Sequence, residues 1–160
     1  MKKVKMMMAV AGLAMAVVLT GCGGSPKGVA EKFATAIVQK DPGKAIGFYE
    51  TFRGSERFEL RTKAEMDQLK KDLEELGKKI NDDKYECETI LEQIRIPTEM
   101  IGYMLVNGKK ITGETATVKV QYVKGKDKKP DGLSVSLMKI DGSWKVTGYS
   151  ELSNLDTDSK

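Results

Sequence analysis

The stretch "TATVKVQYV" (residues 115–123) decides the fold, because polar and apolar residues alternate along it. This period of two is typical of a β-strand with one buried face. Such a strand is stable only when its apolar face packs against another layer. The polar face holds Thr115, Thr117, Lys119 and Gln121, and the other face holds Ala116, Val118, Val120 and Tyr122.

Turn signals and further alternation surround this stretch on both sides. Asn107-Gly108 before it is a strong two-residue hairpin signal, and Asp141-Gly142 after it is another. After the second turn, the segment Ser143–Ser150 places Trp144 and Val146 on one face. We expect Trp144 to lie mostly in the core. Between the two turns, a further strand would bury Leu133, Val135, Leu137 and Ile140. The sequence therefore predicts an antiparallel sheet.

Helix signals come earlier in the chain. Ser25-Pro26 and Asp41-Pro42 each combine an N-cap residue with proline at the first helical position. The segment 61–80 has apolar residues spaced by three and four, which predicts an amphipathic helix. Helices followed by an antiparallel sheet make an α+β class, as a single domain over residues 26–152. The candidate core positions of the helices are Val29, Phe33, Ala36, Ile37, Ala45, Phe48, Tyr49, Phe52, Met66, Leu69, Leu73, Leu76 and Ile80.

One segment fits two kinds of structure, and the C-terminal tail is expected to have none. Residues 85–107 fit a strand and a helix equally well, with Pro97 interrupting either element. Residues 153–160 are polar and are expected to form a frayed tail.

The pieces "KITGETATVKVQY" (110–122) and "IDGSWKVTGYSEL" (140–152) resemble a family. They are similar to small bacterial lipoprotein domains of the nuclear-transport-factor-2-like (cystatin-like) superfamily, many labelled as of unknown function. The family's early helix with a buried aromatic matches Phe33, its Ala-x-Val strand matches Ala116–Val118, and its Gly-x-Trp-Lys hairpin matches Gly142–Lys145. The resemblance implies a bent antiparallel sheet wrapped on N-terminal helices as an open cone, whose mouth can hold a small ligand. The chain departs from the family in its long charged helix and in residues 85–107.

The N-terminus predicts export and lipid anchoring. Lys2, Lys3 and Lys5 precede an apolar or small run over residues 6–19, which is too short to span a bilayer. The run leads into Leu19-Thr20-Gly21-Cys22, which resembles the lipobox of bacterial lipoproteins. That resemblance implies a signal peptide over 1–21, diacylglycerol on Cys22, a further acyl chain such as palmitate in many bacteria, and a lipidated tether over 22–25. A plain secretory signal or a short membrane anchor is the alternative.

The predicted location is therefore the bacterial cell membrane, in the cell envelope. Gly23 follows the lipidated cysteine in place of aspartate, which in a host with two membranes implies the periplasmic face of the outer membrane. Without the three lysines of the leader, 24 of the 27 basic residues remain against 23 acidic ones. This balance gives no concentrated basic surface, and we expect no nucleic-acid partner.

The chain contains no histidine, which excludes Ser-His-Asp and Cys-His nucleophile systems and His-containing zinc sites. No cofactor and no metal is predicted, since "NLDTDSK" (154–160) lacks the glycine and glutamate of a calcium loop. Cys87 has no cysteine partner once Cys22 is lipidated, and we expect it to be a small buried residue.

Two functions remain open. The first is a non-catalytic module that binds a small apolar ligand or an envelope protein, with ligand-binding residues that the sequence does not identify. The alternative is an envelope enzyme that uses a pocket carboxylate and a tyrosine, which requires an acid whose pKa an apolar pocket raises. Glu50 beside Tyr49 is the best candidate, although we expect Glu50 to lie at the surface.

A cluster of lysines lies between two predicted strands, in "VKGKDKKPDG" (123–132). We expect a solvated hairpin tip, with contact to anionic lipid headgroups as the functional alternative. The four residues are Lys124, Lys126, Lys128 and Lys129.

Overall fold

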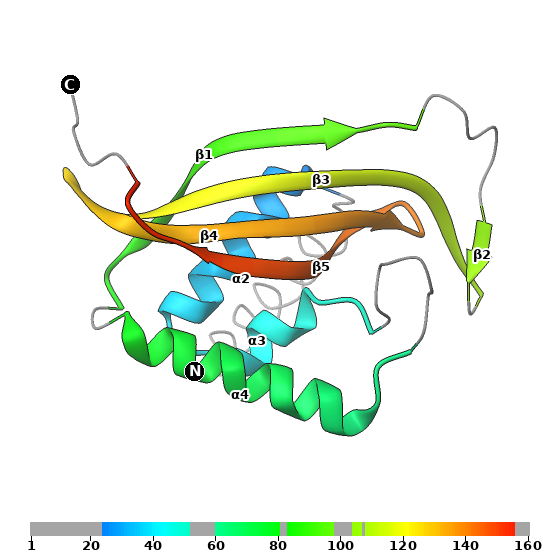
Figure 1. The fold of residues 1–160 in the computed structure, drawn as a ribbon, viewed down its shortest axis with the longest axis horizontal. Helices are drawn as coiled ribbons and strands as arrows, with labels where there is room; N and C mark the ends of the chain where they lie inside the picture. The colour runs from blue at the N-terminus through cyan, green and yellow to red at the C-terminus, as the bar shows by residue number, and fades with distance from the viewer. Residues whose placement is uncertain (1–23, 52–59, 81–82, 98–103, 107, 156–160) are drawn as a thin grey trace, which may run out of the picture.

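A computed structural model describes residues 24–51, 60–80, 83–97, 104–106 and 108–155. Three helices come first and five strands follow, so the predicted α+β class, with N-terminal helices on a bent antiparallel sheet, is confirmed (Figure 1). The helices are α2 (Pro26–Val38), α3 (Pro42–Gly47) and α4 (Lys63–Lys79). The strands are β1 (Glu86–Arg95), β2 (Met104–Val106), β3 (Lys109–Lys124), β4 (Asp127–Ile140) and β5 (Ser143–Leu152).

The sheet is antiparallel and has the order β1-β3-β4-β5, with the short β2 paired to the start of β3. Residues 115–123 lie in β3, between the neighbouring strands β1 and β4 (Figure 1). The predicted hairpin at 107–108 is confirmed, because Val106 pairs with Lys109 and Gly108 has φ +75°. The predicted turn at Asp141-Gly142 also joins two paired strands.

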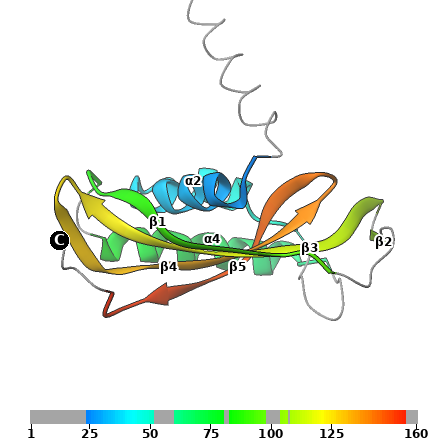
Figure 2. The same cartoon turned by 90° about the horizontal axis from the view of Figure 1, so that it is seen from above.

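Irregular pairing bends the sheet. The β1–β3 register shifts between Thr89 and Leu91, and the β4–β5 register shifts between Ser136 and Leu137. Extra residues of this kind increase the local twist and curve a strand. Figure 2 shows the resulting curvature, with α2 lying on one side of the strands.

The two helix starts predicted from an N-cap residue followed by proline are correct. Ser25 Oγ accepts a hydrogen bond from the Gly28 N–H at 3.0 Å, and Asp41 Oδ1 accepts from the Lys44 N–H at 3.0 Å. The third helix begins two residues later than predicted, since Thr62 is its N-cap and forms a capping box with Glu65.

One continuous core joins the helices to the sheet. Phe33 of α2 is fully buried and lies 5.9 Å, between ring centroids, from both Tyr49 and Tyr149. Trp144 is 8% exposed, which confirms its expected core position. Leu73 and Leu76 of α4 and its C-cap residue Ile80 are buried as predicted. Met66 and Leu69 are only half-buried.

The outer edge of β5 is sealed by the segment after α3. The Glu50 N–H donates to the Val146 carbonyl at 2.8 Å, and the Val146 N–H donates to the Phe48 carbonyl at 2.9 Å. Phe48, predicted to be buried, is half-buried and packs at the margin of the core.

Two further expectations are settled by the fold. The ambiguous region 85–107 contains strands, because β1 pairs with β3 along almost its whole length. The tail departs later than predicted, since the Leu155 N–H donates to the Pro130 carbonyl at 2.9 Å. Cys22, Phe52 and residues 156–160 lie outside the described residues.

Candidate functional site

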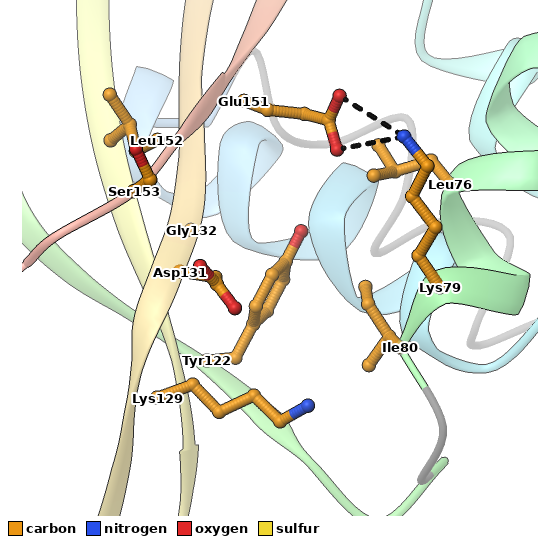
Figure 3. A pocket seen from close by; sticks show the side chains of 10 residues that line it. All are labelled: Leu76, Lys79, Ile80, Tyr122, Lys129, Asp131, Gly132, Glu151, Leu152 and Ser153. Carbon is orange, nitrogen blue, oxygen red and sulfur yellow. Dashed lines mark hydrogen bonds and ion pairs between the residues drawn. The ribbon is translucent and has the colours of Figure 1, made fainter.

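A cleft of about 360 Å³ lies between the C-terminal end of α4 and the strands β3, β4 and β5 (Figure 3). It combines an apolar wall with a charged rim. The wall holds Leu76, Ile80 and Leu152, and the other lining residues are Lys79, Tyr122, Lys129, Asp131, Gly132, Glu151 and Ser153.

Tyr122 forms the base of this cleft. It is 2% exposed, and its hydroxyl is buried with no hydrogen-bond partner among the described residues. Figure 3 shows the ring extending from β3 toward Lys79 and Glu151. A buried hydroxyl without a hydrogen-bond partner costs about 1–3 kcal/mol of stability. The base of this cleft therefore holds a hydroxyl that still lacks a partner.

Burial raises the pKa of Tyr122, and the nearby Cys87 and Glu151 raise it further. The phenol is therefore neutral at physiological pH and can donate a hydrogen bond. An acceptor that entered the cleft would satisfy it.

The rim of the cleft contains both charges. Lys79 Nζ lies 3.4 Å from Glu151 Oε1, and both side chains are more than half exposed. Exposed pairs of this kind contribute about 1 kcal/mol or less, so a ligand can displace them. Lys79 stands four residues after Glu75, a spacing that favours a pair along the helix, but the tertiary structure draws Lys79 to Glu151 on β5. Lys78 and Glu74, which have the same spacing, do pair, at 3.4 Å.

Lys129 and Lys124 have an aromatic neighbour. Their ammonium groups lie 4.7 Å and 5.9 Å from the ring centroid of Tyr85. These two members of the predicted lysine loop are thus drawn toward β1, while Lys126 lies exposed at the tip of the β3–β4 hairpin.

Glu50, the candidate carboxylate, lies elsewhere, and the expectation that it lies at the surface is wrong. It is 2% exposed, because its backbone seals the edge of β5 and the start of β3 covers its side chain. Lys109 Nζ lies 2.7 Å from Glu50 Oε1, and the Thr51 N–H and hydroxyl donate to the same oxygen at 2.8 and 2.9 Å.

The neighbourhood of Glu50 keeps its carboxylate ionised. Burial alone would raise the pKa of Glu50, but the hydrogen bonds from Lys109 and Thr51, with the Lys109 charge, outweigh burial and lower it. An acid catalyst in an apolar pocket needs the opposite shift. Burial raises the pKa of the adjacent Tyr49 to about 12, although the Arg61 guanidinium lies 4.9 Å from its ring centroid.

The remaining candidates can be placed briefly. Cys87 is half-buried, and burial raises the pKa of its thiol to about 12. Within the described ranges, no group of three or more His, Cys, Asp or Glu side chains is arranged to hold a metal ion. No helix in the part of the chain that the structure describes is long and apolar enough to cross a membrane.

Sequence reasoning placed Tyr122 on the buried face but missed the cleft. Its lining combines α4 with three strands that begin about 30 residues or more later in the chain, and no local pattern reports that they meet. The one available signal was a tyrosine at a core position of a strand, because a buried hydroxyl needs a partner.

Comparison with known proteins adds one solved structure. No protein-family model matches the chain, and no curated protein is significantly similar to it. The structure is described as a calcium/calmodulin dependent protein kinase II association domain from Xanthomonas campestris. It has 13% sequence identity and a TM-score of 0.37, and the alignment covers 76% of this chain and 79% of that chain.

Proposed function

We propose that this chain is a lipid-anchored protein of the bacterial cell envelope whose domain is a non-catalytic binding module. Its ligand is a small amphipathic molecule, held in the cleft at the end of α4. The observation that carries this proposal is the Tyr122 hydroxyl, which lies buried and unpartnered at the base of that cleft.

The dimensions and lining of the cleft support a small ligand. Its volume of about 360 Å³ lies at the lower end of the ~300–1,000 Å³ typical of small-molecule sites. Leu76, Ile80 and Leu152 offer an apolar wall to a hydrocarbon part. A neutral Tyr122 donates to a polar head that accepts a hydrogen bond, and we therefore propose a carboxylate-type head.

The surroundings of Glu50 favour binding over catalysis. Lys109 keeps the Glu50 carboxylate ionised and its pKa low. General acid–base catalysis needs a carboxylate whose pKa is raised toward the working pH. The Glu50 carboxylate accepts hydrogen bonds from Lys109 and from the neighbouring backbone N–H. These contacts give the carboxylate a structural role. The enzyme alternative would need a different acid, in contact with Tyr122 or Tyr49.

Titration with octanoate tests the ligand site, with octylammonium as the probe of opposite charge. We expect octanoate to cause saturable chemical-shift changes at Leu76, Ile80, Tyr122 and Leu152 in nuclear magnetic resonance spectra. Tyr122→Phe should weaken octanoate binding roughly fivefold, the equivalent of about 1 kcal/mol for one hydrogen bond. Tyr149→Phe removes a half-buried tyrosine hydroxyl outside the cleft and should leave the affinity unchanged.

Three results would contradict the ligand site: no saturable shifts with octanoate, shifts elsewhere in the domain, or equal effects of the two tyrosine variants. Turnover that disappears when an acid near a tyrosine is changed to its amide, with the fold intact, would favour the enzyme instead.

The anchor is tested through Cys22. Cys22→Ala removes the acyl acceptor, and we expect an unprocessed precursor or a soluble protein in cell fractionation. Mass spectrometry of the membrane-bound wild type should show acyl groups on a chain that begins at Cys22. A Cys22→Ala protein that fractionates with membranes at the normal mature mass would refute the anchor.

A further inference from the structure

Exposed apolar side chains are concentrated on the edge strand β1 and the residue after it. Among the described residues, six large apolar side chains are exposed, and four of them lie between Ile90 and Ile96. We name these four the β1 apolar patch: Ile90 (44% exposed), Leu91 (36%), Ile94 (48%) and Ile96 (67%). Leu91 pairs with Lys119 on the polar face of β3 and Ile94 pairs with Ala116 on the core face, so the patch spans both faces along the free edge of β1. Exposed apolar side chains along a free strand edge favour contact with another surface.

The start of the domain is fastened beside this patch. The Lys27 N–H, in the first turn of α2, donates to Glu92 Oε2 at 2.9 Å. One turn later, Glu31 Oε1 accepts from the Thr89 hydroxyl at 2.6 Å. Figure 1 shows the dark-blue beginning of α2 behind β1 and β3. Two hydrogen bonds thus hold the beginning of α2 against the middle of β1.

The strand register directs part of the patch toward the same side. Ile94 pairs with Ala116, whose side chain lies in the core beneath the helices. Residues directly opposite in an antiparallel pair share a face, so Ile94 projects on the α2 side of the sheet. It comes two residues after Glu92, the partner of Lys27, and so lies near the N-terminal end of α2.

The proposed acyl chains lie close to this point. The N-cap Ser25 comes three residues after Cys22, and an extended chain spans at most about 3.4 Å per residue, or roughly 10 Å in all. The bilayer surface is then within about 10 Å of the beginning of α2. The β1 apolar patch lies beside this point, because Glu92, between Leu91 and Ile94, accepts the hydrogen bond from Lys27 at the start of α2.

We infer that the β1 apolar patch rests on the bilayer into which the acyl chains of Cys22 insert. The inference rests on the proposed lipid anchor. It gives the domain a defined orientation, with the edge strand β1 against the lipid. A second membrane contact next to the anchor also strengthens membrane binding, because the free energies of burying the acyl chains and the apolar side chains in the bilayer add together.

This orientation separates the membrane contact from the ligand cleft. Cys87 pairs with Tyr122 at the base of the cleft, and Ile94 follows Cys87 by seven residues along β1. At about 3.3 Å per residue, the two sites are roughly 20 Å apart along the strand. The lysine hairpin lies at the cleft end of the sheet, away from the beginning of α2 (Figures 1 and 2).

Fluorescence quenching in vesicles tests the inference on the complete lipidated protein. With Cys87→Ala as background, Ile96→Cys carries an environment-sensitive dye on the only free thiol. Leu60→Cys, which replaces an equally apolar side chain that is 55% exposed, and Lys126→Cys at the hairpin tip carry the same dye as controls. The vesicles contain phosphatidylethanolamine and phosphatidylglycerol, with a nitroxide near the top of some acyl chains.

We expect loss of fluorescence from the label at residue 96 and full fluorescence from the labels at residues 60 and 126. Equal quenching at all three positions, or stronger quenching at Lys126, would overturn the inference, and the second result would place the lysine hairpin on the lipid. Mass spectrometry of the same samples separates the two proposals. A chain without acyl groups refutes the anchor itself, whereas an acylated chain with residue 96 unquenched refutes only the orientation.

Discussion

The Glu50 carboxylate and the Lys109 ammonium lie 2.7 Å apart and join two segments that are 59 residues apart in the sequence. Glu50 belongs to the segment that seals the edge of β5, and Lys109 is the first residue of β3 after the β2–β3 hairpin. Glu50 is almost fully buried, whereas the Lys109 side chain is 37% exposed. The pair therefore fixes the hairpin to the body of the domain through one buried charge.

Replacing the cation should destabilise the domain. Lys109→Met leaves the Glu50 carboxylate buried without its ammonium, and hydrogen bonds to charged groups contribute about 1.5–3 kcal/mol. We expect the free energy of unfolding to fall by roughly this amount in urea titrations followed by circular dichroism. Lys126→Met, at an exposed position, is the matched control and should change stability little. A Lys109→Met protein as stable as the control would contradict the structural role of the pair.

The same pair predicts an acid-labile contribution to stability. The pKa of Glu50 is lowered in the folded protein, so its stabilisation is complete above the unfolded pKa of about 4.3 and disappears as the pH falls through the folded pKa. Glu50→Gln should therefore be less stable than wild type at neutral pH, and this difference should shrink below about pH 4. Thermal unfolding of both proteins across this range measures it. A difference that is constant with pH would show that the carboxylate charge is not involved.

Close packing of α4 on α2 makes a glycine necessary. A Cβ at Gly77 would lie 2.7 Å from the Ile37 carbonyl oxygen, which is backbone and cannot turn away. Gly77→Ala should be destabilised by about 1–3 kcal/mol through overpacking, although alanine by itself favours a helix by about 1 kcal/mol. Gly47→Ala has open space around the new methyl group and is the control. A Gly77→Ala protein that gains stability would mean that the two helices separate without cost.

Truncation of Trp144 should affect stability before function. Trp144 is 8% exposed and belongs to the main core, so Trp144→Ala should lower the free energy of unfolding by about 3–5 kcal/mol. Trp144→Phe keeps most of the apolar volume and should cost less. Circular dichroism follows both variants, since the protein's single tryptophan is lost. Equal stability of Trp144→Ala and wild type would show that this ring fills no core volume.

Local chemistry by itself determined much of the secondary structure and the buried faces. Ser25 and Asp41 cap helices because a side-chain oxygen reaches a backbone N–H three residues ahead. Alternation in Thr115–Val123 placed Val118 and Val120 in the core, because successive side chains of a strand point to opposite faces. Each of these signals is complete within a few neighbouring residues, and so it can be recognised in the sequence.

Long-range contacts decided the rest. β1 is a strand because β3 supplies its hydrogen-bond partners, whereas residues 85–95 alone also satisfy a helical pattern. Glu50 is buried because Lys109 reaches it from a distant hairpin, and Lys79 leaves its helix neighbour for Glu151 on β5. The unpartnered hydroxyl of Tyr122 likewise exists only where α4, β3, β4 and β5 meet. The sequence determined which residues are apolar and where α2 and α3 begin, but the partners of the buried charges and hydroxyls depend on which segments the tertiary structure brings together.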